Sequence, residues 1–223
     1  MGAEAEKKLA AARAVALVEA GMTVGLGTGS TAAHAIRSLG KRVGEGLTVR
    51  GVPTSEASAA LARAEGIPLV DLNEVERLHL AIDGADEVDR RKHCIKGGGG
   101  ALLREKIVAS AADRLVLVVD SGKTVERLGA FPLPVEVVPF AVEQVRRRML
   151  ALGASVELRA GKDGLFVTDE GNRILDCRFG EIVDAAALAA RLDAIPGIVE
   201  HGLFIDMADD VIVGRGDSAH FME

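Results

Sequence analysis

Short aliphatic runs alternate with helix-type segments along the first 120 residues, and this alternation limits the fold more than any other sequence feature. The runs are rich in Val, Ile and Leu, whereas the segments between them are rich in Ala and charged residues. We expect strands at residues 22–26, 47–52, 67–70, 78–82 and 114–119, and helices at residues 3–20, 31–39, 56–65 and 101–112. Strands that alternate with helices predict a parallel sheet that is buried on both faces.

The pattern changes at residues 131–134, Phe-Pro-Leu-Pro, where two prolines indicate a domain boundary. The segments beyond it approximate the order strand, helix, strand, strand, helix, strand, which is typical of a ferredoxin-like domain. A turn signal at residues 169–172, Asp-Glu-Gly-Asn, predicts a hairpin between residues 165–168 and 173–178. We expect the apolar tail at residues 203–213 to return to the first sheet.

Composition argues against several classes of function. The 223 residues carry a net charge of −6 and include six Phe but no Trp or Tyr, so a nucleic-acid partner is not expected. No run approaches the roughly 18 apolar residues of a membrane span, so we expect no membrane partner. The two cysteines, Cys94 and Cys177, form neither a disulfide framework nor a zinc motif, which indicates a reducing, cytoplasmic location. The five histidines show no metal-ligand spacing.

A first glycine-rich turn, Gly-Leu-Gly-Thr-Gly-Ser-Thr at residues 25–31, follows an expected strand and opens an expected helix. Helix N-termini hold phosphates well, because they present unpaired N–H groups and a positive dipole end. Ser30 and Thr31 add hydroxyl groups. The motif is neither a Walker loop nor a full dinucleotide fingerprint. A plain turn capped by Ser30 explains these residues equally well, so this motif alone leaves both interpretations open.

An acidic motif, Asp-Gly-Ala-Asp-Glu at residues 83–87, follows the strand expected at 78–82. The carboxyl ends of parallel strands face the ligand crevice, and paired carboxylates there suit proton transfer. The alternatives are a solvated acidic turn in which Asp86 caps a helix, and a magnesium site. The magnesium site ranks last, because no His or further acid sits at ligand spacing.

A second glycine-rich turn, Lys-Gly-Gly-Gly-Gly at residues 96–100, suggests backbone held against a ligand, because four consecutive glycines are costly in chain entropy. A flexible linker is the alternative, but strongly apolar segments lie on both sides. Glu105 follows on the next helix, and Lys123 follows the strand expected at 114–119. Taken singly, Glu105 is often a helix-dipole partner and Lys123 an exposed turn residue. Together these motifs suit a small phosphorylated substrate and proton transfer without metal or cofactor.

These motifs, with Thr-Ser-Glu at residues 54–56, resemble the ribose-5-phosphate isomerase A family in order and spacing along essentially the whole chain. The acidic motif and the Lys-Gly-Gly-Gly motif are specific in combination, whereas either alone is weak. The resemblance implies a Rossmann-like, mostly parallel α/β sheet flanked by helices, with a smaller ferredoxin-like α+β domain inserted. We place the first domain at residues 1–131 and 204–223. We place the second, expected to serve in oligomerisation, at residues 132–203. The family forms homodimers or homotetramers.

The resemblance further implies interconversion of ribose 5-phosphate and ribulose 5-phosphate through an enediolate, a step of the non-oxidative pentose phosphate pathway that needs no metal or cofactor. It implies that Glu105 moves a proton between C2 and C1. It gives Asp83 a role in opening the furanose ring, and it gives Asp86 and Lys96 roles in binding hydroxyls and stabilising the oxyanion.

The resemblance also implies where the substrate binds. Ser30, Thr31 and Lys123 would bind the phosphate, with Lys7 or Lys8 as a further candidate. The full set of implied substrate-binding residues is Thr28, Gly29, Ser30, Thr31, Asp83, Gly84, Ala85, Asp86, Lys96, Gly97, Gly98, Gly99 and Lys123.

Two other functions remain as alternatives. A hexosamine-phosphate deaminase or a lactonase would share the Gly-Thr-Gly-Ser loop, but is not expected to combine residues 83–86 with Lys96 and the glycine run. A non-enzymatic sensor of sugar phosphates predicts an attached DNA-binding helix-turn-helix and should tolerate loss of Glu105.

Overall fold

The computed structural model describes residues 2–162 and 164–223, which form two compact units. Unit 1 contains residues 2–85, Arg104–Thr124 and Met207–Glu223. Unit 2 contains Asp86–Leu103 and Val125–Asp206. Unit 2 is thus broader than the small domain expected at 132–203, because residues 86–103, 125–131 and 204–206 also belong to it.

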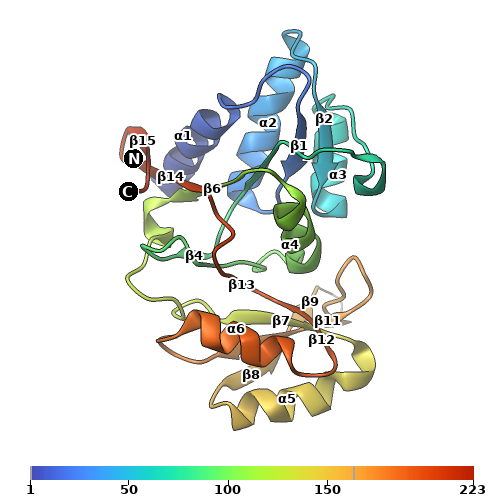
Figure 1. Cartoon of the computed structure of the whole chain (residues 1–223), viewed down its shortest axis with the longest axis vertical. Helices are drawn as coiled ribbons and strands as arrows, with labels where there is room; N and C mark the ends of the chain where they lie inside the picture. Colours follow the sequence, from blue (N-terminus) through green and yellow to red (C-terminus); the bar gives the residue numbers. More distant parts are fainter. Residues whose placement is uncertain (1, 163) are drawn as a thin grey trace. The chain divides into compact units, whose positions relative to one another are not determined.

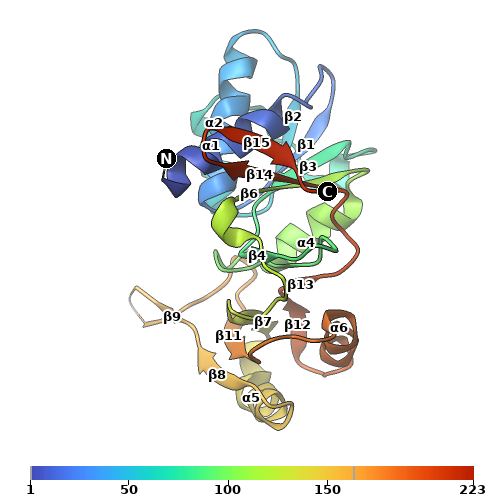
Figure 2. The same cartoon turned by 90° about the vertical axis from the view of Figure 1, so that its left-hand side faces the viewer.

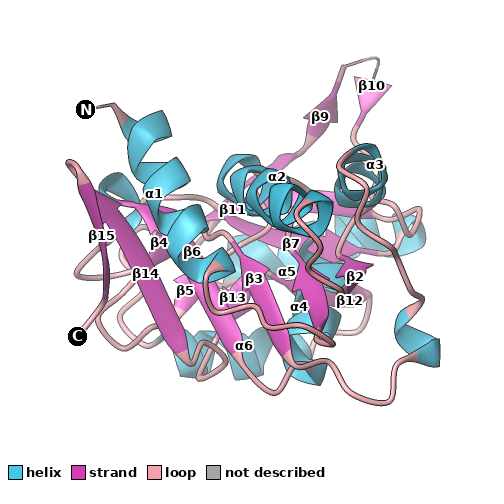
Figure 3. Cartoon of the chain, turned by 90° about the horizontal axis from the view of Figure 1, so that it is seen from above, coloured by secondary structure: helices cyan, strands magenta, loops and turns pink. Residues whose placement is uncertain are grey.

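Unit 1 is built around a six-stranded sheet with the order β15-β14-β6-β3-β1-β2 (Figures 1 and 3). All neighbouring strands from β14 to β2 are parallel, and only β15 at one edge is antiparallel. The strands are β1 (Thr23–Leu26), β2 (Arg50–Pro53), β3 (Leu80–Asp83), β6 (Leu115–Asp120), β14 (Asp210–Arg215) and β15 (Ser218–Phe221). This confirms the mostly parallel sheet. The expected tail at residues 203–213 returns to this sheet only from Asp210, because residues 203–206 belong to unit 2 and Leu203 and Phe204 pair there with Ile95 and Cys94.

Helices cover both faces of this sheet. They are α1 (Ala3–Val15), α2 (Ser30–Gly44), α3 (Glu56–Ala64) and α4 (Leu102–Ala111), whose first two residues belong to unit 2. Val24 and Leu26 of β1 belong to the apolar core shared with α1 and α2. Gly25 points to the opposite face, because side chains alternate along a strand. A Cβ at Gly25 would lie 2.6 Å from the Val108 side chain, so this glycine lets α4 approach β1 closely.

Unit 2 contains a four-stranded antiparallel sheet with the order β12-β7-β11-β8 (Figure 2). Along the chain its elements are β7 (Leu133–Val137), α5 (Val142–Ala151), β8 (Ser155–Leu158), β11 (Arg173–Arg178), α6 (Ala185–Asp193) and β12 (Ile198–His201). This order confirms the ferredoxin-like arrangement. Apolar side chains of the sheet and of both helices form its core.

The hairpin expected between residues 165–168 and 173–178 is wrong. Residue Leu165 instead pairs with Ala160, in a small hairpin of β9 (Ala160–Gly161) and β10 (Gly164–Leu165). Strand β11 is flanked by β7 and β8, so neither of its edges is left for residues 165–168. The turn signal itself was correct, because Gly171 N–H donates to the Thr168 carbonyl at 2.9 Å.

A further three-stranded sheet in unit 2 was not predicted from the sequence. It has the order β13-β5-β4, with β13 (Leu203–Phe204), β5 (Cys94–Ile95) and β4 (Glu87–Val88). Strands of two residues are too short to show an alternating pattern. The described residues also form three 3-10 turns: η1 (Leu72–Glu74), η2 (Ser121–Lys123) and η3 (Pro139–Ala141). Within the described residues, no helix combines the length and the apolar character that crossing a membrane requires.

Candidate active site

The loop between β1 and α2 lies directly against Asp83. Thr28 N–H donates to Asp83 Oδ1 at 3.0 Å. A Cβ at Gly27 would lie 2.1 Å from the same oxygen, so only glycine fits there. The Thr28 hydroxyl contacts the hydroxyls of Thr54 at 2.7 Å and Ser55 at 2.8 Å. The first glycine-rich turn is therefore held by the acidic motif and by the Thr-Ser segment after β2.

The first turn of α2 presents its N–H groups without a side-chain cap. The N-cap is Gly29, with φ +107°, and not Ser30 as the plain-turn interpretation expected. Ser30 is the first helical residue and is exposed, and Thr31 beside it is buried. Uncapped N–H groups, a positive dipole end and two hydroxyls together form an arrangement that suits a phosphate.

Asp83 and Glu105 are buried carboxylates that line the same small internal space of unit 1, between β1, β3 and α4. Asp83 is the last residue of β3 and Glu105 lies in the first turn of α4; each is only 3% exposed. Asp83 Oδ1 also accepts the Gly84 N–H at 2.7 Å. Buried carboxylates near the carboxyl end of a parallel strand are suited to general acid–base catalysis.

Lys123 follows the carboxyl end of β6, at the same edge of the sheet as Asp83 and the β1–α2 loop. It closes the 3-10 turn η2, in which the Asp120 carboxylate accepts the Gly122 N–H at 3.0 Å. Lys7 on α1 forms an ion pair of 2.7 Å with Glu4, and Lys8 is exposed. Gly84 and Ala85 are the last residues of unit 1 before the chain enters unit 2.

The other predicted site residues lie in unit 2, where the second glycine-rich turn folds against Asp86. Gly98 N–H donates to Asp86 Oδ2 at 2.7 Å, and Asp86 N–H donates to the Ile95 carbonyl at 2.8 Å. The Lys96 side chain is only 2% exposed, and its Nζ lies 5.4 Å from the centre of the Phe204 ring. Unit 2 thus brings Asp86, Lys96 and the glycine turn together in one local structure.

The third acid of the acidic motif, Glu87, has a structural role. Its carboxylate accepts N–H groups from Gly129 at 2.7 Å and Phe131 at 2.6 Å, and it is 4% exposed. Asp86 and Glu87 are neighbours in the sequence but hold different loops. The sequence shows three acids in five residues and cannot separate these roles.

One group of metal-ligating type occurs among the described residues, formed by Asp193, Glu200 and His201 in unit 2. His201 Nδ1 accepts the Leu203 N–H at 3.2 Å, and Nε2 lies 3.1 Å from Asp193 Oδ1. The neutral ring that satisfies both contacts carries its proton on Nε2, the atom that would have to bind the metal. A metal there would require a proton on Nδ1, facing the Leu203 N–H, so the group does not suit a cation.

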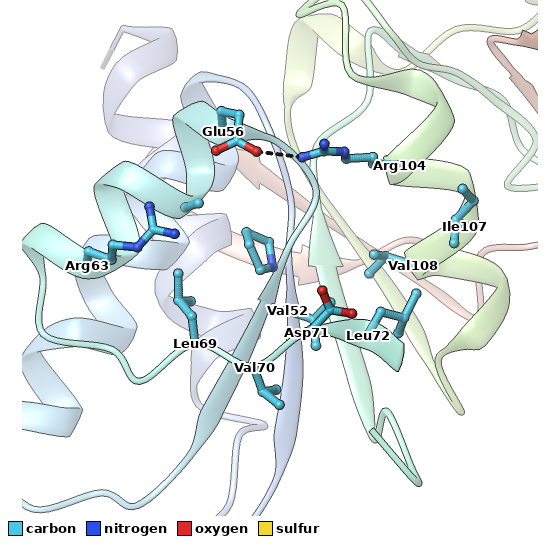
Figure 4. A pocket seen from close by; sticks show the side chains of 12 residues that line it. Val52, Glu56, Arg63, Leu69, Val70, Asp71, Leu72, Arg104, Ile107 and Val108 are labelled. Atoms are coloured by element: carbon cyan, nitrogen blue, oxygen red, sulfur yellow. Dashed lines mark hydrogen bonds and ion pairs between the residues drawn. The ribbon is translucent and has the colours of Figure 1, made fainter. Parts of the chain in front are cut away.

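An open pocket of about 530 Å³ lies elsewhere in unit 1 (Figure 4). It is lined by residues of β2, α3 and α4 and of the segment after α3, and no predicted site residue lines it. Glu56 and Arg104 are joined there by an ion pair of 3.0 Å. Arg104 lines this pocket, whereas the adjacent residue Glu105 lines the small internal space that it shares with Asp83. The volume of this pocket is therefore no guide to the position of the buried carboxylates.

Comparison with known proteins identifies the family of this chain. A family model described as "Ribose 5-phosphate isomerase A (phosphoriboisomerase A)" matches residues 50–218. The Ribose-5-phosphate isomerase A of Sphingopyxis alaskensis is 54% identical over 213 residues, which cover 96% of this chain and 93% of that protein. The Ribose-5-phosphate isomerase A of Rhodopseudomonas palustris is 52% identical over 230 residues, covering 100% of this chain and 99% of that protein.

Solved structures give the same result. The ribose 5-phosphate isomerase A of Methanocaldococcus jannaschii matches with a TM-score of 0.93 and 44% identity over 98% of both chains. A D-ribose-5-phosphate isomerase in complex with phospho-erythronic acid matches with a TM-score of 0.97 and 41% identity over 100% of both chains. The similarity therefore extends over both units.

Proposed function

The chain belongs to the ribose 5-phosphate isomerase A family and is an aldose–ketose isomerase, and we propose that it interconverts ribose 5-phosphate and ribulose 5-phosphate with Glu105 as the base. The observation that carries this assignment is that Asp83, at the carboxyl end of β3, and Glu105, in the first turn of α4, are buried around the same small space of unit 1. A phosphorylated sugar as substrate is supported by the solved relative that holds phospho-erythronic acid.

The substrate phosphate binds at the first turn of α2, where Ser30 and Thr31 donate hydroxyls and Lys123 adds a cation. Lys7 is a further candidate ligand. The absence of a side-chain cap at Gly29, the N-cap of α2, supports this assignment. Thr28 holds this turn in place through its hydrogen bonds with Asp83 and with Thr54 of the Thr-Ser segment. Binding energy from the phosphate then holds the reacting end of the sugar in place.

The reaction is a proton transfer between neighbouring carbons. Asp83 assists opening of the furanose ring. Glu105 then takes the proton from C2 of the aldose, which leaves an enediolate, and returns it to C1, while a second proton passes from O2 to O1. Asp86 and Lys96 bind the hydroxyls and stabilise the negative oxygen, together with the backbone N–H of Gly99. Preset donors of this kind stabilise charge without reorganisation during the reaction.

Replacing Glu105 with Gln tests the proposed base. We expect turnover of ribose 5-phosphate to fall by about 10²–10⁴-fold while the substrate still binds, because the amide cannot accept the proton. Ketopentose formation is measured in excess EDTA, with Glu45→Gln as a control at an exposed position of unit 1. Near-normal turnover in Glu105→Gln would remove the assignment of the base. Loss of wild-type activity in EDTA would restore the metal alternative, and binding without turnover in the wild type would favour the sensor.

We also propose that the protein is a homodimer or homotetramer in the cytoplasm and that unit 2 contributes to the assembly. The assembly is supported by Phe140 and Val183, which are large apolar side chains exposed at 101% and 81% in unit 2. The cytoplasmic location is supported by the bacterial relatives and by Cys94 and Cys177, which are both buried free thiols.

A further inference from the structure

Arg159, which directly follows β8, binds the glycine-rich turn of unit 2 from the side of its carbonyl groups. Its Nη1 donates to the Gly97 carbonyl at 2.8 Å and to the Gly98 carbonyl at 3.3 Å. On the other side, Nε and Nη2 form a two-pronged contact with the Asp176 carboxylate at 2.9 Å and 2.5 Å. The Phe166 ring lies 5.7 Å from the guanidinium carbon. The Arg159 and Asp176 side chains are only 13% and 19% exposed, so their ion pair is largely shielded from water.

The peptide between Gly97 and Gly98 is held at both ends. Its carbonyl oxygen accepts from Arg159, and its N–H donates to Asp86 Oδ2 at 2.7 Å. The same carbonyl also accepts the Gly100 N–H at 3.0 Å, which closes the turn. The turn is packed tightly as well, since a Cβ at Gly98 would lie 2.6 Å from Asp86 Oδ1. Arg159 and Asp86, a predicted substrate-binding carboxylate, therefore hold this peptide group from opposite ends.

The contact between Arg159 and the Gly98 carbonyl also sets the orientation of the next peptide group, between Gly98 and Gly99. The Gly98 carbonyl and the Gly99 N–H belong to one peptide group, and the described chain contains no cis peptide bond. In a trans peptide the C=O and the N–H point in opposite directions. Since the Gly98 carbonyl is directed at Arg159, the Gly99 N–H is directed away from it. A cation at the carbonyl end also polarises the peptide and strengthens its N–H as a donor.

We propose that Arg159, held by Asp176, is a positioning residue for the isomerisation: it fixes the peptides of residues 97–99 so that the Gly99 N–H faces the developing oxyanion and Asp86 stays in place to bind the substrate hydroxyls. Arg159 acts through this turn and does not itself touch the substrate. This role rests on the function proposed above, because it assumes that the turn binds the sugar. Misplacement of catalytic donors by about 1 Å can cost roughly 100-fold in rate.

The test compares Arg159→Lys with the wild type. Lysine keeps the positive charge but lacks the planar fork that reaches Asp176 and two carbonyls together. We expect kcat to fall by about 10- to 100-fold, with a smaller change in KM and a folded protein. Asp176→Asn should lower kcat less, because Arg159 keeps its carbonyl contacts. Arg178→Lys, at an exposed position of the same strand β11, is the matched control and should keep the wild-type kcat.

Two further measurements separate positioning from general stability. Exchange of the Gly98 amide hydrogen should be faster in Arg159→Lys, whereas amides of the β7–β11 ladder should remain protected. Added ethylguanidinium should partly restore kcat in Arg159→Ala, because it can occupy the space left by the side chain. A wild-type kcat in Arg159→Lys, or a kcat loss fully explained by unfolded protein, would overturn the role of Arg159. Absence of isomerase activity in the wild type would instead overturn the proposed function.

Discussion

Glu6 shows at the scale of one residue how a buried carboxylate connects distant segments of unit 1. It lies on α1 and accepts the Gly216 N–H at 2.9 Å, and the Ser121 N–H at 3.0 Å and hydroxyl at 2.7 Å. The hydrogen bond from Gly216, followed by those from Ser121, lowers the pKa of Glu6 from 4.5 to about 2. Ser121 begins the turn that ends at Lys123, so Glu6 also supports a proposed phosphate ligand.

The lowered pKa of Glu6 predicts how stability depends on pH. Because the folded-state pKa lies below the unfolded-state value, the contribution of Glu6 is complete above about pH 4.5 and is lost as pH falls towards about 2. We expect Glu6→Gln to be less stable than the wild type near neutral pH, with the difference shrinking across that window. Urea unfolding at a series of pH values measures this, with Glu19→Gln as an exposed control. A difference that stays constant down to pH 2 would contradict the assignment.

At the scale of the element, the N-terminus of α2 and the turn η2 show why strand ends could be interpreted from the sequence. Both follow strands of one parallel sheet, and the carboxyl ends of such strands meet at a common edge. The sequence therefore predicted that the residues after β1, β3 and β6 share a function. Hydrogen bonds confirm the proximity of Thr28 and Asp83, which are 55 residues apart in the chain.

Lys123→Ala tests the phosphate role of η2. We expect KM for ribose 5-phosphate to rise roughly 10-fold or more with little change in kcat, because a contact made equally in the ground state and the transition state is lost. Lys162→Ala, at an exposed position of unit 2, is the control. Steady-state kinetics separate the two parameters. A fall in kcat at unchanged KM would show that Lys123 acts on the reacting atoms and not on the phosphate.

Elements without a regular pattern were beyond prediction from the sequence. Residues 165–168 look like a strand beside a strong turn, yet β11 already pairs with β7 and β8 on its two edges. Glu87 looks like part of an acidic cluster, yet it holds the backbone at Gly129 and Phe131. In both cases a partner from elsewhere in the chain decides the outcome, and local periodicity carries no record of it.

At the scale of the whole molecule, assembly is the property open to the most direct test. We expect the 23.2 kDa chain to sediment as a dimer or tetramer. Phe140→Ser should shift the population towards the monomer, because it removes a fully exposed aromatic surface from unit 2. Ile107→Ser, which changes a partly exposed apolar residue of unit 1, is the matched control. A monomeric wild type, or dissociation only in Ile107→Ser, would contradict assembly through unit 2.

The sequence by itself determined the parallel sheet, the ferredoxin-like order and the two glycine-rich turns, because these depend on local propensity, periodicity and the geometry of strand ends. It also singled out Asp83, Asp86, Lys96 and Glu105, although only the motif of Asp83 and Asp86 directly follows a strand of the parallel sheet. Only the tertiary structure decided that Arg159, 62 residues beyond Gly97, holds the second turn. Contacts of this kind join side chains to backbone atoms far along the chain, and backbone atoms are the same in every residue, so no sequence pattern identifies them.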